Sequence, residues 1–180
     1  MDISYQFGCA NLPQQQAISV IGGSKVSNQS YEIAIELGRE IAKNNFVLIT
    51  GGRTGVMEAA SKGCQEEGGF ALGLLPGENK HEANQFISFA IPTGLGDARN
   101  ILVVRAGDGI IVIDGSFGTL SEIAFAQLLE KPLVILSSYG MLVEIFNVPP
   151  FNEIPRADTP AQAVQSTATE LPMAQPRPAV

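Results

Sequence analysis

Residues 46–67, FVLITGGRTGVMEAASKGCQEE, decide the fold class of this chain. The stretch begins with an apolar run, Phe46–Thr50, passes through the glycine-rich turn Gly51–Gly55 and continues with apolar residues at helical spacing. Apolar runs of this length are typical of strands that are buried on both faces. A buried strand that leads through a small turn into a helix is the repeating unit of a parallel α/β sheet.

The same alternation continues along most of the chain. The predicted strands are Ala17–Ile21, Phe46–Thr50, Phe70–Leu75, Ile87–Ile91, Gly109–Ile113 and Leu133–Leu136. The predicted helices are Ser30–Asn44, Gly55–Glu67, Leu95–Arg105, Gly118–Leu129 and Pro160–Leu171, the last with Thr159 as its N-cap. Crossovers of this length predict a Rossmann-like, doubly wound parallel sheet of six or seven strands flanked by helices.

Length and composition predict a single domain. The chain has 180 residues, of which 45% are hydrophobic and 16% are charged, so it can bury a full α/β core. Proline is concentrated late in the sequence. We therefore expect the domain to cover residues 16–171 and a disordered, proline-rich tail to cover residues 172–180.

Charge and residue counts argue against several functional classes. The net charge of −7 is opposite to that of a surface that binds nucleic acid. Two cysteines, Cys9 and Cys64, and one histidine, His81, are too few for a disulfide scaffold or a histidine-rich metal centre. No apolar run reaches the roughly 18–20 residues of a membrane span, and no signal-peptide pattern is present. We expect a cytoplasmic protein without a metal site of its own.

Three glycine-bearing turns at strand ends predict a ligand-binding edge. They are Ile21–Ser24, Thr50–Gly55 and Asp114–Thr119. Glycine lets the backbone approach a ligand, and the following helix offers free N–H groups and a positive dipole end. Since the carboxyl ends of parallel strands share one edge, these turns predict a cradle for a phosphate and its attached group. The alternative is that the glycines only make tight turns.

Motifs for the common cofactors are absent from the sequence. There is no G-x-x-x-x-G-K-[ST] run, and Gly22-Gly23 lacks the third glycine of the G-x-G-x-x-G pattern. The second strand ends in Thr50, where a dinucleotide-binding protein carries an acidic residue. No lysine has the context of a Schiff base. NAD, FAD and pyridoxal phosphate are therefore not expected.

Two charged residues are the strongest candidates for chemistry. Arg99 lies near a predicted helix start, where a guanidinium can clamp a phosphate, and the alternative is an ion pair with Asp97. Glu122 is the carboxylate that hydrolysis of an N-glycoside requires. In the competing interpretation, Thr119 and Glu122 form a T-x-x-E capping box, and both roles are compatible.

The remaining candidates have equally plain structural alternatives. Arg53 either faces the ligand edge or is solvated, and Met57 either faces the ligand or packs in the core. Ser24 and Lys25 either donate to a phosphate or cap the next segment. Asp114 either contacts the ligand or is only solvated.

Three segments together resemble a known superfamily. They are Gly51-Gly52-Arg53-Thr54-Gly55-Val56-Met57, Gly96-Asp97-Ala98-Arg99-Asn100 and Asp114-Gly115-Ser116-Phe117-Gly118-Thr119-Leu120-Ser121-Glu122. The combination resembles the Rossmann-like superfamily historically labelled lysine decarboxylase-like. That superfamily includes the nucleotide phosphoribohydrolases of the Lonely-guy type and the molybdenum cofactor carrier proteins. The third segment is similar to the P-G-G-x-G-T-x-x-E signature.

Two departures from the hydrolase pattern favour the carrier branch. Asp114-Gly115-Ser116 replaces Pro-Gly-Gly, and Gly96–Asn100 stands where the hydrolases have an M-H-x-R-K run. The resemblance therefore implies binding of the molybdenum cofactor (molybdopterin), a phosphorylated pterin whose own dithiolene holds the metal. The protein would protect the cofactor and deliver it to molybdoenzymes, without being an enzyme itself.

The implied cofactor-binding residues come from the glycine turns and the two charged segments. They are Gly22, Gly23, Ser24, Gly51, Gly52, Arg53, Gly55, Val56, Met57, Arg99, Asp114, Gly115, Ser116, Phe117, Gly118, Thr119 and Glu122. The alternative function is a nucleoside 5′-monophosphate phosphoribohydrolase in which Arg99 places the phosphate and Glu122 is catalytic. A sensor domain that binds a nucleotide derivative without turnover is a third possibility.

The predicted helix Gly118–Leu129 is apolar on more than one face, so one face is available to a partner chain. The resemblance likewise implies a homodimer or a homotetramer. A monomer whose helices cover its own sheet is the alternative.

Overall fold

Six strands alternate with helices in the computed structural model, which describes residues 15–137 and 141–171. The strands are β1 (Ala17–Gly22), β2 (Val47–Thr50), β3 (Ala71–Leu75), β4 (Phe89–Pro92), β5 (Gly109–Ile113) and β6 (Leu133–Ser137). The α-helices are α1 (Asn28–Lys43), α2 (Val56–Glu66), α3 (Asn100–Ala106), α4 (Phe117–Leu128), α5 (Met141–Ile145) and α6 (Pro160–Glu170). The short 3-10 helices are η1 (Lys80–Glu82), η2 (Gly96–Arg99) and η3 (Phe151–Glu153).

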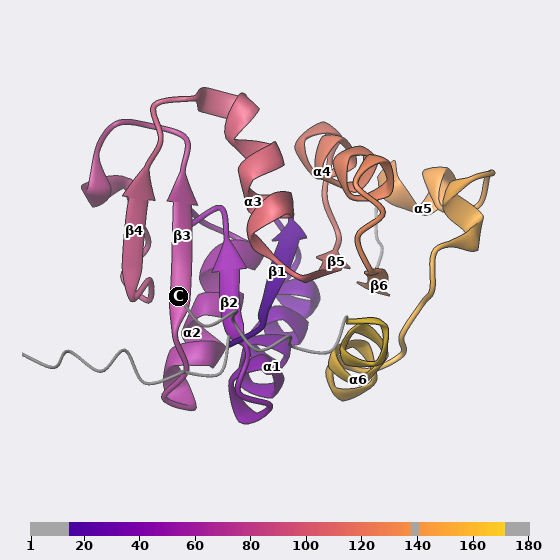
Figure 1. Cartoon of the computed structure of the whole chain (residues 1–180), viewed down its shortest axis with the longest axis horizontal. Helices are drawn as coiled ribbons and strands as arrows, with labels where there is room; N and C mark the ends of the chain where they lie inside the picture. The colour runs from indigo at the N-terminus through magenta and orange to yellow at the C-terminus, as the bar shows by residue number, and fades with distance from the viewer. Residues whose placement is uncertain (1–14, 138–140, 172–180) are drawn as a thin grey trace, which may run out of the picture.

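All six strands pair in parallel, in the order β4-β3-β2-β1-β5-β6. In register, Ile18 of β1 lies between Leu48 of β2 and Gly109 of β5. The chain builds the sheet outward from β1 to β4 and then returns to place β5 on the other side of β1. The strand order therefore reverses between β1 and β5, and ligands of such sheets bind at the carboxyl edge beside this reversal. The arrowheads of β1 to β4 point to that edge in Figure 1.

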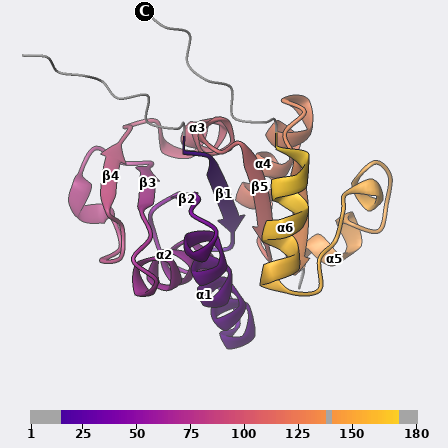
Figure 2. The same cartoon turned by 60° about the horizontal axis from the view of Figure 1, so that its bottom comes forward.

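Helices cover both faces of the sheet (Figures 1 and 2). The helices α1, α2 and α6 pack on one face, and α3, α4 and α5 pack on the other. Each face of the sheet has its own hydrophobic core. Strand β1 contributes to both, since Val20 belongs to the core under α1 and Ile21 to the core under α4. Burial on both sides explains why the central strands of the sheet are largely apolar.

Glycines bring α1 and α2 into close contact. A Cβ atom at Gly38 would collide with the carbonyl oxygen of Ala60, and one at Gly63 would collide with that of Ile35. No other residue fits these two positions without separating the helices. Since α1 follows the first glycine turn and α2 the second, this contact also sets how the two turns lie relative to each other.

The predicted fold class is confirmed, and so is the cap of the last helix, where the Thr159 hydroxyl accepts from the Gln162 N–H. One predicted helix is wrong in detail. Leu95–Arg105 divides into η2 and α3, because Gly96 has a positive φ and the first bonds are of the 3-10 type. The α5 helix was not predicted, and the predicted tail at 172–180 lies outside the described residues. No helix in the described ranges is long and apolar enough to span a membrane.

Candidate functional site

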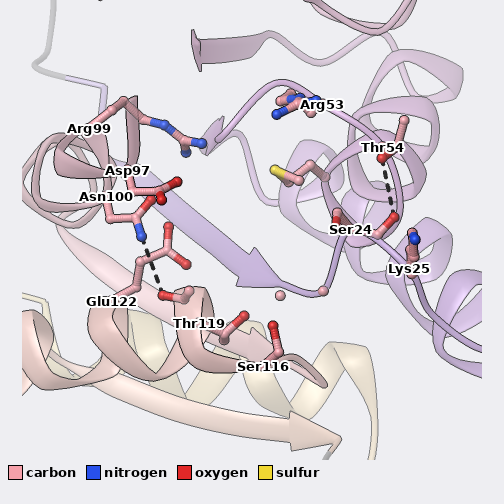
Figure 3. Close-up of a pocket in the computed structure, with 14 residues that line it drawn as sticks. Ser24, Lys25, Arg53, Thr54, Asp97, Arg99, Asn100, Ser116, Thr119 and Glu122 are labelled. Atoms are coloured by element: carbon pink, nitrogen blue, oxygen red, sulfur yellow. Dashed lines mark hydrogen bonds between the residues drawn. The ribbon is translucent and has the colours of Figure 1, made fainter. Parts of the chain in front are cut away.

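A cavity of about 330 Å³ opens at the carboxyl edge of the sheet, where the strand order reverses. The three glycine turns, η2 and the first turn of α4 surround it. Its lining residues are Gly22, Gly23, Ser24, Lys25, Arg53, Thr54, Met57, Asp97, Arg99, Asn100, Ser116, Gly118, Thr119 and Glu122. Figure 3 shows their side chains converging on the cavity from both sides.

Hydrogen bonds join the first two glycine turns into one wall. The Val56 N–H donates to the Gly23 carbonyl over 3.0 Å, and the Thr54 hydroxyl donates to the Ser24 carbonyl over 3.2 Å. Gly55, the N-cap of α2, has a φ of 71°, which favours glycine, and lies against the carbonyl of Gly23. Besides Gly22 and Gly23, this wall brings five larger residues to the cavity: Ser24, Lys25, Arg53, Thr54 and Met57.

Asn84, from the connection between β3 and β4, fixes the second turn from outside. Its N–H donates to the Gly52 carbonyl over 2.9 Å, and its Nδ2 donates to the Arg53 carbonyl over 2.8 Å. The same Nδ2 lies 3.2 Å from the Gly52 carbonyl. Because Asn84 binds the carbonyl groups of both Gly52 and Arg53, the backbone of the second turn is fixed at the residue that carries the Arg53 side chain.

The third turn leaves the N-terminus of α4 open to the cavity. Asp114 has a φ of 53°, and its carboxylate accepts from the Gly115 N–H over 2.6 Å and from the Ser30 hydroxyl over 3.2 Å. Ser116 is the N-cap of α4, but its side chain makes no capping hydrogen bond. The first N–H groups of α4 therefore remain available to an anion.

The capping box considered for Thr119 and Glu122 is wrong. The helix begins at Phe117, so both residues lie inside it and cannot form the reciprocal pair at its start. Thr119 and Glu122 instead line the cavity. Asn100 strengthens this region because its Nδ2 donates to the Ser121 hydroxyl over 2.9 Å, which joins α3 to α4.

Arg99 is a buried arginine. It is only 7% exposed, and its Nε has no hydrogen-bond partner among the residues that the structure describes. Its guanidinium lies against Gly51, where a Cβ atom would collide with Nη1 and would come within 2.6 Å of the Met57 sulfur. The ion pair considered with Asp97 is not formed, since the salt bridges among the described residues involve only Arg39 and Lys43 as cations.

Glu122 faces Arg99 from α4 and is also 7% exposed. Burial raises the pKa of its carboxyl group to about 8, although the charge of Arg99 acts in the opposite direction. Burial also lowers the pKa of Arg99, which Glu122 and then Asp97 partly offset. The carboxyl group of Glu122 is therefore mostly protonated at pH 7. The three basic residues that line the cavity, Lys25, Arg53 and Arg99, then face Asp97 as the other acidic residue of the lining.

The structure brings ten of the predicted site residues to the cavity. They are Gly22, Gly23, Ser24, Arg53, Met57, Arg99, Ser116, Gly118, Thr119 and Glu122. Five more belong to the second and third glycine turns without lining the cavity: Gly51, Gly52, Gly55, Asp114 and Gly115. Val56 is instead a core residue, and Phe117 is 76% exposed.

Thr54, Asp97 and Asn100 line the cavity but were not predicted to bind the ligand. All three stand inside the sequence segments that carry the resemblance, so their neighbours were the available signal. Cys64 is buried, which raises the pKa of its thiol to about 11 and makes it unreactive. Within residues 15–137 and 141–171, no cluster of three or more potential ligands forms a metal site.

Comparisons with known proteins relate this chain to two groups. The model of the SLOG cluster4 family matches residues 15–165. The molybdenum cofactor binding protein from the phototrophic bacterium Rippkaea orientalis has 34% identity and a TM-score of 0.80, covering 87% of this chain and 97% of that one. The molybdenum cofactor carrier protein of Chlamydomonas reinhardtii has 30% identity and a TM-score of 0.76, covering 87% and 98%. A cytokinin riboside 5′-monophosphate phosphoribohydrolase of Arabidopsis thaliana is 30% identical over 129 residues, which are 66% of this chain and 57% of the plant protein.

Proposed function

The chain belongs to the SLOG cluster4 family, and from this premise we propose that it binds, protects and carries the molybdenum cofactor. The observation that carries the proposal is the cavity itself. Three cationic side chains and the open N-terminus of α4 converge on it, in a chain whose net charge is −7. A phosphorylated ligand fits this concentration of positive charge. The structural similarity to two molybdenum cofactor proteins supports the choice of ligand.

The phosphate of the cofactor is proposed to bind at the start of α4. The N–H groups near Ser116 and Gly118 have no side-chain cap, and Ser24 and Lys25 stand on the facing turn. Thr119 offers a hydroxyl group beside them. Met57 supplies an apolar surface for the pterin, while the metal stays on the cofactor's own dithiolene.

The second candidate function is hydrolysis of a nucleoside 5′-monophosphate. The observation in its favour is that Arg99 and Glu122 are buried together in the cavity. A carboxyl group whose pKa is raised to about 8 can exchange a proton near neutral pH, as a general acid or base must. Retention of the cofactor without turnover of nucleotides distinguishes the carrier from this enzyme.

We also propose that the protein works as a homodimer or homotetramer and passes the cofactor to a molybdoenzyme. Phe117 and Leu128 of α4 are 76% and 75% exposed, and Leu95 is 51% exposed. Large apolar side chains that are this exposed favour contact with a second chain. Phe117 is next to Ser116, so such a contact would lie beside the cavity.

Cofactor retention tests the proposal directly. The purified protein is incubated with free molybdenum cofactor, separated by gel filtration, and assayed for oxidised pterin in the protein fraction. We expect stoichiometric retention that is weakened in Arg99→Ala, with thermal unfolding used to confirm that the variant is folded. Absence of retention, together with nucleotide hydrolysis that Glu122→Gln abolishes, would establish the second candidate instead.

A further inference from the structure

At its β4 end, the sheet has an apolar surface that extends past the helices. On the side of the sheet that carries α3 and α4, α3 packs on β1 and β2, and α4 packs on β1 and β6. Strands β3 and β4 lie beside α3, at the left of Figure 1. Phe89 and Ile91 of β4 are 51% and 38% exposed, and Phe70, just before β3, is 47% exposed. We call these three side chains the β4 face.

Strand register places the three side chains on one side of the sheet. Partners in a parallel ladder point to the same side, and Leu72 of β3 pairs with both Ile49 of β2 and Phe89 of β4. Ile49 and Leu72 belong to the core under α4, so Phe89 points to that side as well. Phe70 and Ile91 lie two residues from Leu72 and Phe89, respectively, and share their side. Apolar side chains gathered in this way mark a surface that another segment or molecule covers.

The residues that precede β1 in the sequence have a pattern that matches this face. Ile3, Tyr5 and Phe7 alternate with polar residues, so an extended segment would present all three to one side. Gln15 fixes where the segment joins the domain, because its Nε2 donates over 3.1 Å to the carbonyl of Asn45, which lies just before β2. The segment therefore starts on the β2 side of β1, and this side leads to β3 and β4.

The segment is long enough to reach the β4 face. Adjacent strands lie about 4.8 Å apart, so β4 is about 14 Å from β1 across β2 and β3. Phe7 is eight positions before Gln15, and eight extended residues span up to about 26 Å. Attachment to the same chain also gives the segment an effective concentration of about millimolar order, which favours it over a separate molecule.

We propose that residues 3–7 lie on the β4 face of their own chain and cover it. Contact between their three apolar side chains and the exposed rings of the face stabilises this arrangement. At its outer edge the face ends at Lys80, whose Nζ lies 5.2 Å from the centre of the Phe89 ring. The consequence is that the β4 face is closed to a second chain, which leaves contacts between copies to the surface around Phe117. The identity of the ligand has no part in this inference.

A nitroxide spin label on Cys9 tests the placement in the full chain. The other cysteine, Cys64, is fully buried, so the reagent labels Cys9 alone, and mass spectrometry confirms one label per chain. In NMR spectra, we expect the amide signals of β3 and β4 to lose intensity and those of β6, at the opposite edge of the sheet, to lose little. Replacement of both Tyr5 and Phe7 by serine should abolish this loss.

Two single variants test the β4 face itself. Phe89→Ser should abolish the loss of intensity, whereas Val148→Ser, which removes an apolar side chain that is 52% exposed and outside this face, should leave it unchanged. Because the Phe89 side chain is half exposed, the domain tolerates its replacement, and thermal unfolding confirms that the variant is folded.

The proposal is overturned if β3 and β4 keep their intensity, or if the loss persists after Tyr5 and Phe7 are replaced. A mixture of spin-labelled chain with isotope-labelled Cys9→Ser chain tests the other occupant. Loss of intensity in that mixture would mean that a second copy supplies the segment. A lower mass of Phe89→Ser in light scattering would mean that the face joins two copies directly, which also overturns the proposal. Cofactor retention is measured separately, so each of these outcomes leaves the proposed function standing.

Discussion

Replacement of Glu122 by glutamine should stabilise the protein in a manner that depends on pH. The carboxyl group is 7% exposed and has a pKa of about 8 in the folded chain, against an ordinary value of 4.5. Because the folded pKa is the higher one, the contribution of Glu122 to stability is fully present below pH 4.5 and is lost as pH rises toward 8. Glutamine has nearly the same shape and does not ionise.

The size of the effect follows from the two pKa values. At pH 7, Glu122 is ionised in the unfolded chain and mostly protonated in the folded chain. The free energy of unfolding of the wild type is therefore about 3 kcal/mol lower than that of Glu122→Gln. Above pH 8 the difference levels off at about 5 kcal/mol, and below pH 4.5 it disappears. For a chain of this length, about 3 kcal/mol corresponds to a rise in Tm of roughly 6–12 °C.

Chemical denaturation of both proteins at several pH values between 4 and 9 measures this difference. Glu153→Gln, which removes an exposed carboxylate outside the cavity, is the matched control and should show little change. The pH trend of the wild type alone is not informative, since other groups titrate in both proteins. A difference that stays flat from pH 4 to 9 would refute the reasoning, because it would mean that Glu122 is ionised in the folded chain.

Four further predictions concern the site and the surface. Gly51→Ala should displace the guanidinium of Arg99, and cofactor retention should then fall about tenfold or more in gel filtration. Asn84→Ala should lower the free energy of unfolding by about 1–3 kcal/mol in urea and speed hydrogen exchange in the second turn. Cofactor retention should fall as pH rises through about 8 in the wild type but not in Glu122→Gln, since ionised Glu122 opposes an anionic ligand, and gel filtration at pH 6.5 and 9 would show it. Phe117→Asp should reduce the mass measured by light scattering to that of the 19.0 kDa monomer.

Much of the fold was predictable because its elements carry strong local patterns. The predicted strand Gly109–Ile113 coincides with β5, which is buried at every position. The break between η2 and α3 was not predictable, because one turn of 3-10 helix and one turn of α-helix have similar sequence patterns. The five residues of α5 are too few to show a helical period. The predicted superfamily is confirmed by the family model and the solved carrier proteins.

The site was predictable in position but not in the direction of each side chain. Glycine turns located the edge of the sheet, yet Val56 points into the core and Phe117 is exposed. The directions of these two side chains depend on how α2 and α4 are rotated against the sheet, and the packing of the whole domain sets that rotation. Asn84 gave no local signal, because its partners Gly52 and Arg53 are far away in the sequence.

The joining of the first two turns has a consequence for how this cavity can be redesigned. The Val56 N–H and the Thr54 hydroxyl donate to the carbonyl groups of Gly23 and Ser24, so the joint rests on the backbone of the first turn. The side chains of Lys25 and Arg53, which line the cavity from the same two turns, take no part in these bonds. An engineer who wants a different ligand can therefore replace these two side chains while the hydrogen bonds that join the turns stay in place.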